Sequence, residues 1–123
     1  MTVSIVLPCY NEESNIRATV LDVRDWMEAS HVKGEIIVVN DGSTDGTQQE
    51  LLAVSTECPT LKIVGYSPNR GYGFAVKTGC DEATSDIIGY MDSDGQFRAE
   101  DFDRLIPLMK QYSFVTGRRK KRA

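Results

Sequence analysis

Short runs of apolar residues alternate along the chain with segments in which apolar residues recur every three or four positions. The runs are typical of strands covered on both faces, and the periodic segments are typical of helices with one buried face. Strands are expected at residues 3–7, 35–40, 61–66, 87–91 and 114–116. Helices are expected from about residue 11 to the glycine at 34, at 48–56, at 71–83 and from residue 99 onward. This alternation predicts a doubly wound α/β fold with a mostly parallel sheet of about five strands.

The composition is that of an ordinary single globular domain. The 123 residues are 41% apolar and 26% charged, and no apolar run approaches the roughly 18–20 residues that span a bilayer. The first residues lack the basic and apolar regions of a signal peptide, so a cytoplasmic protein is expected. The net charge of −4 argues against a nucleic-acid partner, and we interpret the basic run at 118–122 as a solvated terminus.

Polar residues follow three of the expected strands at their carboxyl ends. Residues 8–13 follow the first strand, Asp41-Gly42-Ser43 follows the second, and residues 92–96 follow the fourth. In open parallel sheets, ligands bind beyond the carboxyl ends of the strands. Turn geometry explains one such cluster easily and three less easily, so we expect a binding site at this edge of the sheet.

The Asp92-Ser93-Asp94 triplet is the strongest candidate for a metal site. In extended backbone, residues two positions apart project to the same side, so both carboxylates can face one point. Gln96 can add a third oxygen, and oxygen ligands suit Mg²⁺ or Mn²⁺. The alternative is a surface turn in which aspartate and glycine serve only loop geometry. The sequence after the first strand is not the glycine-rich turn of dinucleotide-binding folds, and no P-loop sequence occurs.

Four motifs follow one another along nearly the whole chain. They are SIVLPCYNEE at 4–13, IVVNDGSTD at 37–45, NRGYG with AVKTG at 69–79, and YMDSDGQF at 90–97. In this order they resemble the family 2 glycosyltransferases of GT-A fold, and within that family the dolichyl-phosphate and polyprenyl-phosphate sugar synthases. The resemblance implies an α/β sheet whose nucleotide-binding half is Rossmann-like, in agreement with the strand and helix pattern.

The resemblance also implies an activity and the residues that perform it. The activity is inverting transfer of a sugar from a UDP- or GDP-sugar to an acceptor, expected to be a polyprenyl or dolichyl phosphate, with Mg²⁺ or Mn²⁺ as cofactor. Asp41 would accept a hydrogen bond from the base, while Lys77 could reach a phosphate or be simply solvated. The resemblance implies nucleotide-binding roles for Pro8, Tyr10, Glu12, Asp41, Lys77 and Asp92, metal-binding roles for Asp92, Asp94 and Gln96, and catalytic roles for Asp94 and Arg119.

Residues 1–123 are expected to form a single donor-binding domain that stops after the fifth strand, where the resembling family continues. We therefore expect this chain alone to bind the donor without useful turnover and to form a homo-oligomer through the sheet edge left bare. A lipid-phosphate acceptor implies peripheral contact with the cytoplasmic face of a membrane. The alternatives are a noncatalytic nucleotide-sugar-binding module that acts through a partner, and a different metal-dependent α/β enzyme that handles nucleotides.

Overall fold

The computed structural model of the protein describes residues 2–93 and 98–106. Four strands form one sheet in the order β3-β2-β1-β4, and each neighbouring pair is parallel. Their bounds are Thr2–Cys9 for β1, Lys33–Asp41 for β2, Leu61–Tyr66 for β3 and Ile87–Tyr90 for β4. The predicted parallel α/β fold is thereby confirmed. The fifth strand, expected at 114–116, lies outside the described residues.

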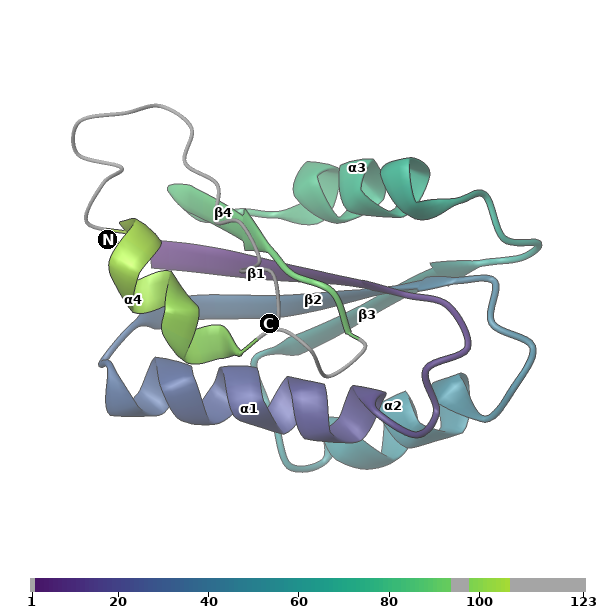
Figure 1. Ribbon diagram of the computed structural model, residues 1–123, viewed down its shortest axis with the longest axis horizontal. Coiled ribbons are helices and arrows are strands. Elements are labelled where there is room, and N and C mark those ends of the chain that lie inside the picture. Colours follow the sequence, from purple (N-terminus) through teal and green to yellow (C-terminus); the bar gives the residue numbers. More distant parts are fainter. Residues whose placement is uncertain (1, 94–97, 107–123) are drawn as a thin grey trace, which may run out of the picture.

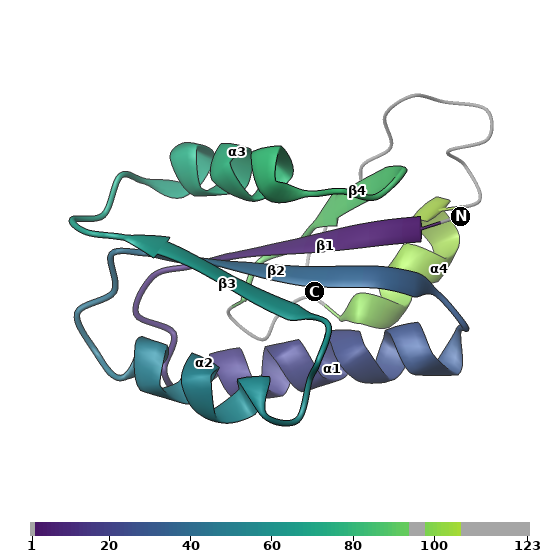
Figure 2. The ribbon, with the colours of Figure 1, turned by 180° about the vertical axis from the view of Figure 1, so that it is seen from behind.

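The helices cover both faces of the sheet and produce three layers (Figure 1). On one face lie α1 (Ile16–Ala29) and α2 (Thr47–Ser55), and α3 (Tyr72–Glu82) covers the other. A short 3-10 turn (Ala99–Asp101) leads into α4 (Phe102–Leu105), which lies on the same side as α1, as the reverse view also shows (Figure 2). In the part of the chain that the structure describes, no helix is both long and apolar enough to cross a membrane.

Successive side chains of β1 and β2 point to opposite faces of the sheet, so the buried apolar residues form two clusters. Ile5 and Leu7 face the larger cluster with α1, whereas Val6 faces the smaller cluster beneath α3. Gly79 of α3 lies so close to this strand that an added Cβ would stand 2.2 Å from Val6 Cγ1. Both faces of the central strands are therefore covered, which explains their continuous apolar sequences.

The first strand is longer than the sequence predicts, because Pro8 does not end it. β1 runs on to Cys9, and Pro8 pairs with Val39 of β2. On the other side, β4 pairs only as far as Val6, so Pro8 lies beyond the last residue of that ladder. A proline placed there removes no ladder hydrogen bond, because its missing N–H points past the end of the neighbouring strand.

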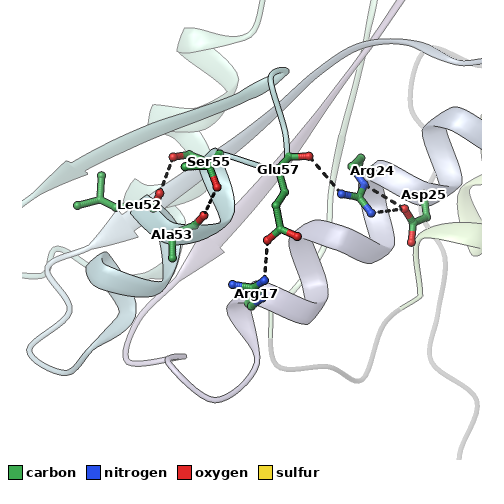
Figure 3. A network of polar contacts seen from close by, with 8 residues as sticks. Arg17, Arg24, Asp25, Leu52, Ala53, Ser55 and Glu57 are labelled. Carbon is green, nitrogen blue, oxygen red and sulfur yellow. Dashed lines mark hydrogen bonds and ion pairs between the residues drawn. The ribbon is translucent and has the colours of Figure 1, made fainter.

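Charged residues on the surface join α1 to the turn that follows α2 (Figure 3). Glu57 receives hydrogen bonds from two arginines of α1, at its carboxylate from Arg17 (2.6 Å) and at its carbonyl oxygen from Arg24 (3.2 Å). Arg24 also pairs with the neighbouring Asp25 at 2.8 Å. Exposed pairs of this kind contribute little to stability, so the helices are held chiefly by the apolar cluster beneath them.

Glu35 connects all four strands at the opposite end of the sheet from the polar loops. Its carboxylate accepts hydrogen bonds from Ser4 Oγ of β1 (2.7 Å) and from the backbone N–H and hydroxyl of Thr84 (both 2.8 Å), just before β4. Lys62 of β3 pairs with its other oxygen at 2.9 Å. Burial alone would raise the pKa of Glu35, but these hydrogen bonds outweigh it and lower the pKa from 4.5 to about 2.

Glu35→Gln is expected to lower the free energy of unfolding by about 1–3 kcal/mol at neutral pH, because the amide cannot accept from all these donors. Since the folded pKa lies below the unfolded one, the stabilisation by Glu35 is complete above pH 4.5 and is lost as the pH falls towards 2. Urea unfolding of both proteins across this range measures the difference. A difference that stays constant down to pH 2 would contradict the role given to the carboxylate.

Candidate functional site

A cavity of about 230 Å³ lies at the carboxyl ends of the strands. Because β2 and β3 lie on one side of β1 and β4 on the other, the strand order reverses between β1 and β4. This reversal is where open α/β sheets bind ligands. The lining residues come from the end of β1, the end of β2 and the start of α3, and they are Pro8, Cys9, Tyr10, Asp41, Asn69, Gly71, Tyr72 and Ala75.

The loops that follow β1 and β2 are hydrogen-bonded to each other beside this cavity. Asn11 donates its backbone N–H to Ser43 Oγ (3.0 Å), and its side-chain oxygen accepts from the N–H of Thr44 (2.8 Å). One residue on, the N–H of Glu12 donates to Thr47 Oγ1 at 2.9 Å. Because these residues serve the loop contact, α1 begins only at Ile16, five positions later than the sequence predicts.

The carboxylate of Asp41 is buried and already oriented. Its two oxygens accept from the backbone N–H groups of Arg70 (2.8 Å) and Gly71 (3.1 Å), and only 5% of the residue is exposed. Gly42 has a φ of 65°, and a Cβ there would stand 2.3 Å from the backbone nitrogen of Asn69. Only glycine allows this approach of the two loops. Each carboxylate oxygen keeps a lone pair that can accept a further hydrogen bond from a ligand in the cavity.

Asp92 follows β4 and contacts a residue that lines the same cavity. Its Oδ1 accepts a hydrogen bond of 2.9 Å from the hydroxyl of Tyr72, a lining residue. The next residue, Ser93, is 3% exposed and donates from its hydroxyl to the carbonyl oxygen of Pro8 at 2.9 Å. The carbonyl oxygen of Ser93 accepts from Thr19 of α1 at 3.4 Å. The turn that carries Asp92 is thus tied to both β1 and α1.

Among the residues that the structure describes, the cavity is lined by one acidic side chain, that of Asp41, and by no positively charged one. Burial raises the pKa of the Cys9 thiol to about 12, and the charges of Glu12, Asp45 and Asp41 add to this effect. Cys9 is therefore a neutral thiol and no nucleophile. Asp92 has no ion pair among the described residues, and its oxygens are ligands that suit a hard cation. Asp92 could therefore contribute one carboxylate to a site for a divalent cation.

Comparison with known proteins identifies the family. The model of glycosyl transferase family 2 matches residues 4–123. The chain belongs to this family. It is 30% identical over 119 residues to a dolichyl-phosphate beta-glucosyltransferase of Trichomonas vaginalis, covering 93% of this chain and 37% of the relative. It is 33% identical over 117 residues to an undecaprenyl-phosphate 4-deoxy-4-formamido-L-arabinose transferase of Aeromonas hydrophila, covering 94% of this chain and 36% of that one.

A solved structure of a glycosyltransferase has the same fold. The mannosyltransferase PcManGT from Pyrobaculum calidifontis, in complex with GDP-Man and Mn²⁺, has a TM-score of 0.67 and 27% sequence identity. The match covers 75% of this chain and 27% of that one. The family 2 chain described here thus spans little more than a third of the length of the two relatives above.

Some of the residues predicted from the sequence line the cavity of this family 2 chain and others do not. Pro8, Tyr10 and Asp41 line it, and Asp92 is bonded to its wall. Glu12 lies at the loop contact, where its side chain accepts from Asn15. Lys77 forms an exposed ion pair with Asp81 on α3 at 2.9 Å and does not line the cavity. Asp94, Gln96 and Arg119 lie outside the described residues, within which no cluster of three potential metal ligands occurs.

Two residues of the site were missed from the sequence of this family 2 protein. Tyr72 is the first residue of α3, and only the folded chain brings it to Asp92, twenty positions later. In the sequence, Ser93 only separates two acids, yet in the structure its hydroxyl anchors the turn to Pro8. No local sequence pattern indicates either the burial of Ser93 or the partner of Tyr72.

Proposed function

We propose that the chain binds a UDP- or GDP-sugar together with Mg²⁺ or Mn²⁺ and serves transfer of the sugar to a polyprenyl or dolichyl phosphate. The observation that carries the proposal is the cavity at the strand reversal, with Asp41 buried in its wall and Asp92 bonded to Tyr72, one of its lining residues. Membership of family 2 supports a transferase, and the names of the relatives support the class of acceptor.

The base of the nucleotide would lie against Tyr10 and Asp41. Tyr10 is 45% exposed and lines the cavity, so a base could stack on its ring. The carboxylate of Asp41 can accept from an N–H of uracil or guanine, because its backbone partners leave lone pairs unused. Since a carboxylate cannot donate, the site would disfavour bases that present an acceptor at the same position.

The diphosphate would lie towards Asp92, with Asp94 and Gln96 as further proposed ligands of the cation. A bound divalent cation would supply charge neutralisation for the leaving nucleoside diphosphate. Asp92 would hold one side of this site, and its orientation is set by Tyr72 and by the anchored Ser93. We propose that the acceptor phosphate displaces the nucleotide directly at the anomeric carbon with inversion, and that Asp94 and Arg119 serve this step.

A lipid-linked acceptor would bring the protein to the cytoplasmic face of a membrane as a peripheral protein. The relatives named as dolichyl-phosphate and undecaprenyl-phosphate transferases support an acceptor of this kind. Self-association stays a prediction, which light scattering of the purified chain measures. Radiolabelled sugar transfer to a polyprenyl phosphate distinguishes a transferase from a module that only binds the donor.

The proposed donor site is tested by the thermal stability of the chain with UDP and GDP, in Mn²⁺ and in EDTA. One of the two nucleotides is expected to raise the apparent stability by about 2.7 kcal/mol at a hundredfold excess over its Kd. Most of this increase should require Mn²⁺, since no cationic side chain lines the cavity among the residues that the structure describes. Equal increases in Mn²⁺ and in EDTA would refute the metal-dependent site, and no increase with either nucleotide would refute the donor class.

A further inference from the structure

Tyr72 lies between Asp41, where we propose that the base binds, and the turn at Asp92 and Ser93, where we propose that the cation binds; this turn is called the metal turn below. Asp41, at the end of β2, accepts from the backbone of Arg70 and Gly71, and Tyr72 is the next residue along the chain. The hydroxyl of Tyr72 then donates to Asp92 Oδ1 at 2.9 Å, although 54% of the residue is exposed. One tyrosine thus joins the two acids of the site, which come from opposite sides of β1.

The backbone that carries Tyr72 is held firmly. Gly71 has a φ of 99°, which favours glycine, and its carbonyl oxygen accepts from the N–H of Ala75 at 3.1 Å to begin α3. The guanidinium of Arg70 lies 5.0 Å from the ring centre of Phe74 of α3, which is a cation–π contact. The carboxylate of Asp41 binds the N–H groups of the two residues before Tyr72, so the backbone that carries the Tyr72 ring has a defined position.

The carboxylate that receives the hydroxyl is held as firmly from its own side. Ser93 follows Asp92 and is bonded to β1 through Pro8 and to α1 through Thr19. Both partners of the hydrogen bond are therefore set by the fold before any ligand binds. A contact between two anchored groups restricts the rotation of the carboxylate at little further cost in entropy.

We infer that Tyr72 is a positioning residue for the metal turn, and this inference rests on the proposed function. A phenol hydroxyl on Oδ1 orients Asp92 while leaving Oδ2 and a lone pair of Oδ1 for a cation. Because the phenol is neutral, Asp92 keeps its full negative charge for a cation. A lysine or arginine in the same place would neutralise that charge. Hydrogen bonds of this kind to a metal-binding carboxylate typically account for about 10–100-fold in metal affinity.

The test is Tyr72→Phe on the full chain, with nucleotide affinity measured calorimetrically in Mn²⁺ and in EDTA. The probe is whichever of UDP and GDP the wild-type chain binds. The substitution keeps the ring that lines the cavity and removes only the hydroxyl, so affinity in EDTA should stay within about twofold. The gain in affinity on adding Mn²⁺ should fall by about 10–100-fold. The melting temperature without ligand should not change, because the side chain is largely exposed.

Tyr90→Phe is the matched control, since Tyr90 is 44% exposed, lies two positions before Asp92 and does not line the cavity. It should keep the full gain from Mn²⁺. A full gain in Tyr72→Phe would overturn the inference and leave the proposed function intact. An equal loss in Mn²⁺ and in EDTA would also overturn it, because the hydroxyl would then serve cavity packing. A wild-type chain without any gain from Mn²⁺ would refute both the inference and the proposed function.

Discussion

Asp92→Asn is expected to abolish the Mn²⁺-dependent part of nucleotide binding. Of the wild-type gain in apparent stability, about 2.7 kcal/mol at a hundredfold excess of nucleotide over Kd, only the smaller part that the wild type keeps in EDTA should remain. The amide removes the negative charge that a hard cation requires, while its side-chain oxygen can still accept from the hydroxyl of Tyr72. The fold should therefore be kept, and thermal unfolding with and without Mn²⁺ separates the two effects.

The matched control for this charge is Asp25→Asn. Asp25 lies on α1, its side chain is 64% exposed, it pairs with the adjacent Arg24 (Figure 3), and no described residue of α1 lines the cavity. The same change in net charge at this position should leave the Mn²⁺ dependence as in the wild type. If Asp92→Asn behaved like Asp25→Asn, Asp92 could not be a metal ligand.

Asp41→Ala is expected to weaken binding of UDP or GDP by roughly 1–3 kcal/mol, which is about 5–150-fold in Kd. A base N–H buried against this position would lose its acceptor. The backbone N–H groups of Arg70 and Gly71 would lose theirs as well, so the free energy of unfolding without ligand should also fall, by about 1–3 kcal/mol. Calorimetry in EDTA and urea unfolding measure the two losses separately.

Comparison of four nucleotides separates base recognition from loop support. Uracil and guanine present a ring N–H where cytosine and adenine present an acceptor nitrogen. The wild type should therefore prefer UDP or GDP to CDP and ADP, and Asp41→Ala should lose this preference. If Asp41→Ala weakened all four nucleotides by the same factor, Asp41 would only support the loop.

The fold could be predicted from the sequence because its elements are encoded locally. β3 begins and ends where the apolar run at 61–66 does, and α2 agrees with expectation to within one residue at each end. The errors occur where a contact distant in sequence takes precedence over the local pattern. Pro8 stays in β1 because β4 has already ended beside it, and α1 starts late because Asn11 binds the loop after β2.

Only those residues of the candidate site that directly follow a strand could be predicted from the sequence. Asp41 and Tyr10 line one cavity as expected, because parallel strands bring their carboxyl ends to one edge. The partners of Asp41 could not be predicted, since two backbone N–H groups from the loop before α3 carry no side-chain signal. Lys77 faces Asp81, four positions along the same helix, a pairing that the helical period could have indicated.

Because β1 lies between β2 and β4 in the sheet, the two sides of the cavity are assembled in a fixed order as the chain is synthesised. β1 meets β2 across 31 positions, at Thr2 and Lys33, but meets β4 across 84, at Val3 and Ile87. Closing the longer loop costs about 0.9 kcal/mol more in chain entropy from length alone. In a growing chain, every residue lining the base side has been made once Ala75 is added, when Asp92 does not yet exist. The half of the cavity proposed to recognise the nucleoside is therefore synthesised, in each molecule, before the part proposed to bind the phosphates.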